Sequence, residues 1–302
     1  MHVELIVPGL LAAPEDTRLP ALELLLARGR SSAGDAQGYF SWLGAAFGIE
    51  PLPAGALSAS AGGFWLRADP VHLHLLRDRM VLLPVSGLRP DEADQLVAAL
   101  NRHFAGTHEF RCPLPDCWVV RMAPAAIDTL GTLPTREVAG KDFDAHLPGA
   151  PWPALLNEIQ MVLHEHPVNE AREQPVNSVW LWGPGELPLA ASSRWRSLTA
   201  NEPVALGLAR VAGIGHRVPP RTGSSWLASA TPQDGQHLVV LDSAAAALEA
   251  DWFAPLLEAL RSGRVGMLTI QVPDAGLSFE TTRPDLRRFW RRPRALASHA
   301  PR

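Results

Sequence analysis

Residues 237–272 read HLVVLDSAAAALEADWFAPLLEALRSGRVGMLTIQV, and this stretch decides the fold class. The apolar runs 237–242 and 264–272 have the length and β-branched content of buried strands. The segment between them, 243–263, is rich in Ala and Leu and ends at a glycine, as is typical of a helix. Strand, helix and strand in this order predict a crossover unit with two parallel strands in one sheet.

The beginning of the chain repeats this pattern. Residues 3–7 form an apolar run that stops at Pro8-Gly9, which predicts a buried strand. Residues 20–29 predict a helix, with proline at its start and glycine at its end. The small polar residues 31–38 predict a loop. The first and last thirds of the chain are therefore expected to share one mostly parallel α/β sheet.

The middle of the chain follows another pattern, which predicts an inserted α+β unit. Residues 64–76 and 79–85 look like two paired strands, and residues 89–104 like an amphipathic helix. Further strands are expected before residue 122. The predicted domains are a discontinuous core, 1–63 with 151–302, and an inserted unit, 64–150.

Residues 164–185, HEHPVNEAREQPVNSVWLWGPG, contain the tripeptide PVN twice, with Arg172 between the two copies. One interpretation is an anion site, in which the guanidinium fork of Arg172 acts with His166 and the amides of Asn169 and Asn177. The other is structural, with the histidine and the asparagines capping a helix end and holding the turns. The two interpretations are compatible, and both remain open.

A second candidate for ligand binding is the pair Arg67 and Asp69, within the predicted strand 64–76. The alternative is that these side chains share one face of the strand and pair with neighbouring groups. The complete set of candidate ligand-binding residues is Arg67, Asp69, His166, Asn169, Arg172 and Asn177.

Composition excludes several classes of function. The formal net charge of −4 gives no reason to expect nucleic acid or an anionic membrane as the main partner. No apolar run reaches the roughly 18 residues of a membrane-spanning helix. The N-terminus resembles a first strand more than a secretion signal, so a cytoplasmic protein is expected.

The last 20 residues, 283–302, contain seven arginines. They are expected either to dock an acidic protein partner or nucleic acid, or to pack on the body of the protein. In the second case Leu286, Phe289 and Trp290 would be covered and the arginines would lie around them.

Four stretches together resemble the archaeal-type cofactor-independent phosphoglycerate mutases of the alkaline-phosphatase superfamily, and among them a bacterial branch of RpfE-type regulatory proteins. They are residues 67–83, 91–104, 166–185 and 209–215. The resemblance implies an alkaline-phosphatase-like fold: a mostly parallel sheet flanked by helices, with an inserted α+β unit. It also implies a family chemistry in which two divalent metals, such as manganese, activate a serine for phosphoryl transfer.

This chain departs from the family pattern where that chemistry would be located. Pro8-Gly9 replaces Asp-Gly after the first strand, and Asp35 stands where the family has its serine. Asp242 is followed by SAAAALEA and not by Gly-His, and the stretch TIQVPDAG, 269–276, lacks the family's Asp-His. We therefore expect no catalytic residues, no metal ligands and no cofactor.

The expected function is that of a non-catalytic or regulatory relative of phosphoglycerate mutase, with a pocket for a phosphate or carboxylate ligand around Arg67 and Arg172. Two alternatives remain open. One is an active mutase-like isomerase or phosphatase with two divalent metals. The other is an interaction module that docks a protein through residues 283–302.

Overall fold

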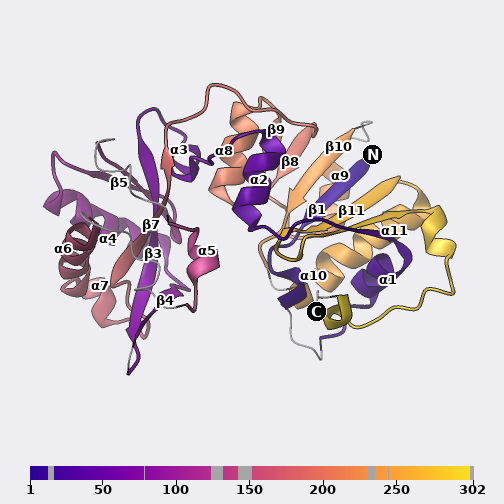
Figure 1. Cartoon of the computed structure of the whole chain (residues 1–302), viewed down its shortest axis with the longest axis horizontal. Coiled ribbons are helices and arrows are strands. Elements are labelled where there is room, and N and C mark those ends of the chain that lie inside the picture. Colours follow the sequence, from indigo (N-terminus) through magenta and orange to yellow (C-terminus); the bar gives the residue numbers. More distant parts are fainter. Residues whose placement is uncertain are drawn as a thin grey trace. The chain divides into compact units, whose positions relative to one another are not determined.

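The computed structural model describes residues 1–12, 17–77, 79–123, 132–141, 152–229, 235–243 and 245–299 (Figure 1). The chain forms two compact units, each with its own sheet. The first unit contains Met1–Gly48 and Ala190–Arg302, and the second contains Ile49–Leu189. No helix within the described ranges is long and apolar enough to cross a membrane.

The first unit is built on a seven-stranded sheet. Its order is β2 (Arg30–Ala33), β12 (Leu277–Thr282), β11 (Met267–Val272), β1 (His2–Ile6), β10 (Gln236–Val240), β8 (Ser197–Thr199) and β9 (Gly215–Arg217). The five strands from β11 to β9 are parallel, whereas β12 runs antiparallel to both β11 and β2. β10 and β11 flank β1, so the crossover predicted from residues 237–272 is confirmed.

Helices cover both faces of this sheet (Figure 1). Val3 and Leu5 of β1 face a core formed with α1 (Pro20–Arg28), α9 (Gly223–Ser229), α10 (Ala245–Leu248) and α11 (Ala254–Ser262). Because side chains alternate along a strand, Glu4 faces the other way. On that face it contacts Trp195, which packs against Phe47 of α2 (Tyr39–Phe47). The helix α8 (Pro203–Val211) packs on β8 and β9.

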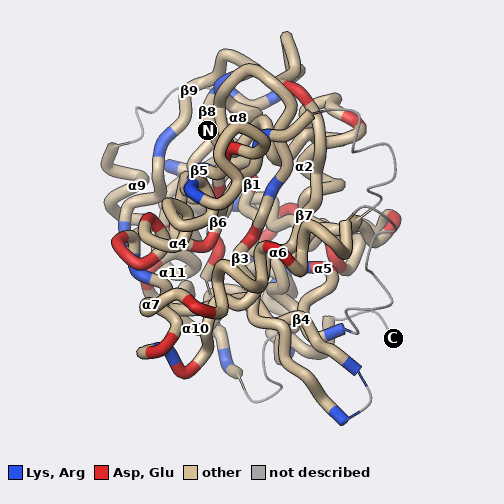
Figure 2. The backbone as a smooth tube through the Cα atoms, turned by 90° about the vertical axis from the view of Figure 1, so that its left-hand side faces the viewer, with Lys and Arg blue, Asp and Glu red and all other residues tan. Residues whose placement is uncertain are grey.

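The second unit is an antiparallel sheet with helices. The eleven-residue strand β3 (Trp65–Leu75) is its centre and pairs with β4 (Met80–Pro84), β6 (Cys117–Arg121) and β7 (Ser178–Gly185), while β5 (Glu109–Leu114) pairs with β6. Its helices are α3 (Ala54–Ala59), α4 (Pro90–His103), α5 (Thr135–Val138), α6 (Trp152–His164) and α7 (Pro167–Glu170). Two basic residues, Arg77 and Arg79, lie at the tip of the β3–β4 hairpin (Figure 2).

The helix α4 shows why the predicted amphipathic helix forms. Its apolar stripe, which includes Leu96 and Leu100, is buried, and Pro90 occupies its first turn. The carboxylate of Glu92 accepts a hydrogen bond from the backbone N–H of Arg89 at 3.0 Å, which caps the N-terminus. Glu92 Oε1 lies 2.9 Å from Arg89 Nη1, and Oε2 also accepts from Arg172, so this carboxylate joins the start of the helix to two arginines.

The second unit extends beyond the expected insert, 64–150, at both ends. At its beginning, α3 packs on β3, β6 and β7. At its end, β7 pairs along β3, and α6 packs on β7. These contacts bring residues 49–63 and 152–189 into the second unit. The expected boundary at 150/151 itself lies outside the described residues, which exclude 142–151.

Two local expectations were wrong. Residues 31–33 of the expected loop belong to the edge strand β2, which gains its hydrogen bonds from β12. A further strand, β12, follows β11 and was not predicted from the sequence. In the tail, Leu286 packs on the core, but the side chains of Phe289 and Trp290 are 80% and 66% exposed. Residues 300–302 of the tail lie outside the described residues.

Candidate functional site

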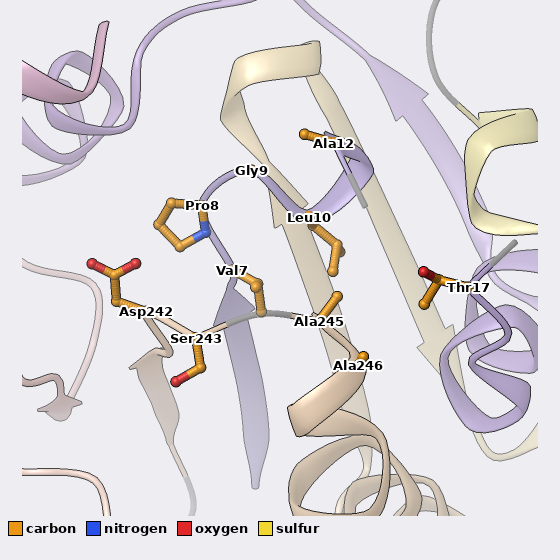
Figure 3. A pocket seen from close by; sticks show the side chains of 10 residues that line it. All are labelled: Val7, Pro8, Gly9, Leu10, Ala12, Thr17, Asp242, Ser243, Ala245 and Ala246. Atoms are coloured by element: carbon orange, nitrogen blue, oxygen red, sulfur yellow. The ribbon is translucent and has the colours of Figure 1, made fainter. Parts of the chain in front are cut away.

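A cavity of about 480 Å³ opens in the first unit at the carboxyl ends of β1 and β10. In parallel α/β sheets this edge is where ligands bind, because the loops that follow adjacent strands diverge there. Asp242 and Ser243 lie on one side of the cavity and Thr17 on the other, with Val7, Leu10 and Ala245 between them (Figure 3). The described residues that line the cavity are therefore mainly apolar, and Asp242 is the one carboxylate among them.

The residues at these strand ends do not fit a two-metal centre. Divalent cations need several carboxylate, imidazole or carbonyl ligands that converge on one point. Pro8 supplies no donor side chain after β1, and Asp35 is exposed. Asp274, after β11, accepts a hydrogen bond from the Gly9 backbone N–H at 3.0 Å and so joins two loops. Among the described residues, no three His, Cys, Asp or Glu side chains are grouped to hold a metal ion.

The amide of Gln271 is also engaged within the sheet. Its Nε2 donates to Glu4 Oε1 at 2.8 Å. The Glu4 side chain is 2% exposed and accepts further hydrogen bonds from Arg194 Nη2 and Trp195 Nε1, both at 2.7 Å. Sequence reasoning did not single out this cluster. The available signal was an acidic residue inside an otherwise apolar strand, since a buried carboxylate requires partners.

In the second unit, Arg67 and Asp69 form a buried ion pair on one face of β3. Arg67 Nη2 and Nε lie 2.6 and 2.8 Å from Asp69 Oδ1, and the guanidinium lies 5.2 Å from the ring centre of Trp182. Asp69 Oδ2 accepts hydrogen bonds from Trp182 Nε1 at 2.7 Å and from Thr135 Oγ1 at 2.5 Å. These contacts match the structural alternative, in which the pair binds neighbouring protein groups.

His166 and Asn169 hold the turn after α6. His166 is the N-cap of α7, and its Nδ1 accepts a hydrogen bond from the Val168 N–H at 3.3 Å. Burial, followed by the charge of Arg102, lowers the pKa of His166, which favours the neutral ring that this cap requires. Asn169 donates to the carbonyls of Leu163 and Val176 at 2.7 and 2.8 Å and accepts from the Val176 N–H at 2.9 Å. Its amide thereby joins the two PVN copies.

Asn177 acts as an extension of the sheet. Its Oδ1 accepts from the backbone N–H of Leu73 at 2.7 Å, and its Nδ2 donates to the Leu73 carbonyl at 3.0 Å. The side-chain amide therefore takes the place of a strand partner for β3.

Arg172 connects the PVN segment to the start of α4. Its Nη1 lies 2.8 Å from Glu92 Oε2, and its Nη2 donates to the Ser86 carbonyl at 2.8 Å. Longer hydrogen bonds of 3.3 Å reach the carbonyls of Gly87 and Gln174. The guanidinium side chain is 11% exposed, so its donors are directed mainly at protein oxygens.

Arg67 and Asn177, which both belong to the candidate ligand-binding set, lie at different points along β3. Arg67 pairs with Trp182 in the β3–β7 ladder, whereas Asn177 binds Leu73, six residues further along β3. At roughly 3.3 Å per residue, the two groups lie about 20 Å apart along the strand. One small anion cannot contact both Arg67 and Asn177. The pocket expected around Arg67 and Arg172 stays a prediction, and each of the two guanidinium groups is directed at protein groups.

Comparison with known proteins relates the chain to one group of enzymes by sequence. No family model matches. A probable 2,3-bisphosphoglycerate-independent phosphoglycerate mutase of Geobacter sulfurreducens is 33% identical over 159 residues, 48% of this chain and 39% of that protein. The corresponding enzyme of Methanosarcina barkeri is 35% identical over 75 residues, 21% of this chain and 19% of that protein. The matches thus span less than half the length of these relatives.

Two solved structures align with most of the chain. The PH0037 protein of Pyrococcus horikoshii aligns with a TM-score of 0.50 and 14% identity, over 93% of this chain and 87% of that one. The cofactor-independent phosphoglycerate mutase of Thermoplasma acidophilum aligns with a TM-score of 0.47 and 18% identity, over 100% and 95% of the two chains. The expected fold class, a mostly parallel sheet with flanking helices, is confirmed. Over about half of its length, the chain is thus similar in sequence to 2,3-bisphosphoglycerate-independent phosphoglycerate mutases.

Proposed function

We propose that this chain is a non-catalytic, regulatory relative of the phosphoglycerate mutases that does not bind the two divalent metals of that chemistry. The observation that carries the proposal is the strand-end cavity, where Asp242 is the only carboxylate among the described lining residues. Phosphoryl transfer between oxygens needs concentrated positive charge to stabilise its transition state. The described residues of the cavity are mainly apolar and supply no positive charge.

The six candidate residues of the second unit support the same proposal. Their polar atoms bind other protein groups, so they serve as the framework of the sheet and its turns. The resemblance to RpfE-type regulatory proteins adds the expectation that the fold now acts by binding and not by turnover. A fold can be retained when the catalytic side chains of an enzyme are lost, and the same fold can then serve another role.

The test is an activity assay with a matched variant. Purified protein and Asp242→Asn are assayed for phosphoglycerate mutase and phosphatase activity in manganese and in magnesium, with circular dichroism to verify folding. We expect neither protein to exceed the blank. Turnover by the natural chain that Asp242→Asn abolishes would contradict the proposal.

Ligand binding gives a second readout that does not depend on catalysis. A ligand that binds only the folded state raises its melting temperature. We expect no manganese-dependent shift with 3-phosphoglycerate, since the strand-end cavity has no set of metal ligands among its described residues. A saturable, metal-dependent shift would favour the active-enzyme alternative.

A further inference from the structure

A second cavity of the first unit, of about 520 Å³, lies where the arginine-rich tail meets the end of α1. Residues of the tail and of the sheet edge line it together, among them Ser31, Phe279, Trp290, Arg292, Arg294 and His299. It is a different place from the strand-end cavity, whose lining residues it does not share. The volume is within the range of sites for small molecules, about 300–1,000 Å³.

The tail is fixed to the first unit by several contacts. Arg288 Nη2 lies 2.7 Å from Asp285 Oδ1, and its Nη1 donates to the Arg28 carbonyl at 3.0 Å. Arg28 in turn donates to the Leu286 carbonyl, and Leu296 is buried in the core. The wall that the tail contributes to the cavity is therefore held in place.

The cavity is strongly cationic. Arg291 lines it and donates to the Gly29 carbonyl at 2.6 Å. Arg292 and Arg294 are exposed, and neither forms an ion pair or hydrogen bond within the part of the chain that the structure describes. None of the described lining residues is acidic. Two guanidinium forks are thus available for an anion, and phosphate is the anion whose geometry they match best.

The same cavity offers aromatic surface. Trp290 is 66% exposed, although exposure of so large an apolar side chain is unfavourable. The ring of His299 packs edge-on against Phe279 at 5.6 Å. Its Nε2 is buried and has no hydrogen-bond partner among the described residues, which is costly for a polar atom. An aromatic ligand would have the exposed ring of Trp290 to stack on.

We propose that this cavity binds a small phosphate-bearing molecule with an aromatic ring, of the chemical class of a purine mononucleotide. Arg292 and Arg294 bind the phosphate, and Trp290 stacks on the ring. The volume favours a small molecule over a polymer, and the net charge of −4 disfavours a polyanion that would extend across the surface. The site is independent of the strand-end cavity and of the function proposed for it.

Titration calorimetry with adenosine monophosphate (AMP), adenosine and inorganic phosphate tests the proposal on the full chain. We expect AMP to bind, and adenosine and phosphate each to bind about tenfold more weakly or worse, since each lacks one group. The double change Arg292→Ala with Arg294→Ala should weaken AMP by about tenfold or more. Trp290→Ala should weaken both AMP and adenosine.

Arg221→Ala is the matched control, because it removes one exposed positive charge elsewhere in the same unit. It should leave AMP affinity within about twofold, as a change in distant charge is screened by salt. Asp242→Asn should also leave it unchanged, which separates this site from the strand-end cavity. Melting temperatures of all variants verify folding. The double change Arg292→Lys with Arg294→Lys should retain part of the affinity for AMP.

Several results would overturn the proposal. They are no binding of AMP at millimolar concentration, equal affinity for AMP and adenosine, or a double variant that binds AMP as the natural chain does. A single-stranded oligonucleotide that binds much more tightly than AMP and is weakened by the same double change would identify a nucleic-acid surface. An acidic peptide that binds there while AMP does not would identify a protein-docking surface.

Discussion

At the scale of single residues, the polar side chains of the second unit show how a ligand-like motif can serve structure. Asn169 makes two hydrogen bonds to Val176 that join the two PVN copies and a third to the Leu163 carbonyl, and Asn177 continues the β3 ladder. Arg172 bridges from this segment to Glu92 at the start of α4. Each polar group thereby satisfies backbone or carboxylate groups that would otherwise be buried without a partner.

Replacing Arg172 by Ala should destabilise the second unit by about 2 kcal/mol. The loss lies between those for exposed and fully buried ion pairs, because Glu92 keeps its contacts with Arg89. Urea unfolding followed by tryptophan fluorescence measures the effect. Arg79→Ala, at the exposed tip of the hairpin, is the control and should change stability by less than about 0.5 kcal/mol. Equal effects of the two changes would contradict the bridging role of Arg172.

His166 should make stability depend on pH. Its folded-state pKa lies below the ordinary value near 6.5, chiefly through burial, so the unfolded chain takes up a proton first as the pH falls. The folded state therefore loses stability as the pH is lowered below about 6.5. Burial likewise lowers the pKa values of His2, His108 and His299, which adds to the same trend.

The change His166→Asn isolates this contribution, since asparagine is a good N-cap that does not titrate. Melting temperatures at pH 7.5 and 5.5 provide the measurement. The natural chain should lose more on acidification than His166→Asn does. Identical losses would show that His166 has no part in the pH dependence.

At the scale of elements, the sequence predicted the helices and strands that are determined by the local residue pattern. The crossover at 237–272 and the helix α4 follow from periodicity and from glycine and proline at their ends. β2 and β12 were missed because Ser31, Ser32 and Ser278 carry little strand signal, and their pairing comes from the sheet edge. The site was predicted in part: the departures at the strand ends are visible in sequence, whereas the partners of Arg67 and Arg172 depend on distant pairing.

The contact of α3 with β3 depends on Gly55. A Cβ at this position would lie 2.4 Å from backbone atoms of Leu66, which cannot move without displacing the central strand. Gly55→Ala should therefore destabilise the second unit by about 2–3 kcal/mol. The control is Gly62→Ala, where a Cβ would meet nothing within 4 Å. The urea midpoints of the two variants measure the two losses of stability. A Gly55→Ala variant as stable as the natural chain would contradict the close packing.

At the scale of the whole molecule, the chain combines an enzyme-like framework with strand ends that lack the expected charge. The parallel sheet of the first unit presents Pro8, Asp242 and Asp274 at its carboxyl edge. Asp274 is engaged with a backbone N–H, and Asp242 lines a mainly apolar cavity. Among the described residues, these strand ends hold no group of three His, Cys, Asp or Glu side chains that could bind a metal ion.

The most direct measurement of this claim is the metal content of the folded chain. Protein is dialysed against excess manganese, freed of unbound ions by gel filtration, and analysed by plasma mass spectrometry, with Asp242→Ala treated in parallel. We predict far less than one manganese ion per chain in both proteins. About two ions per chain in the natural protein, lost in Asp242→Ala, would contradict the absence of the metal centre.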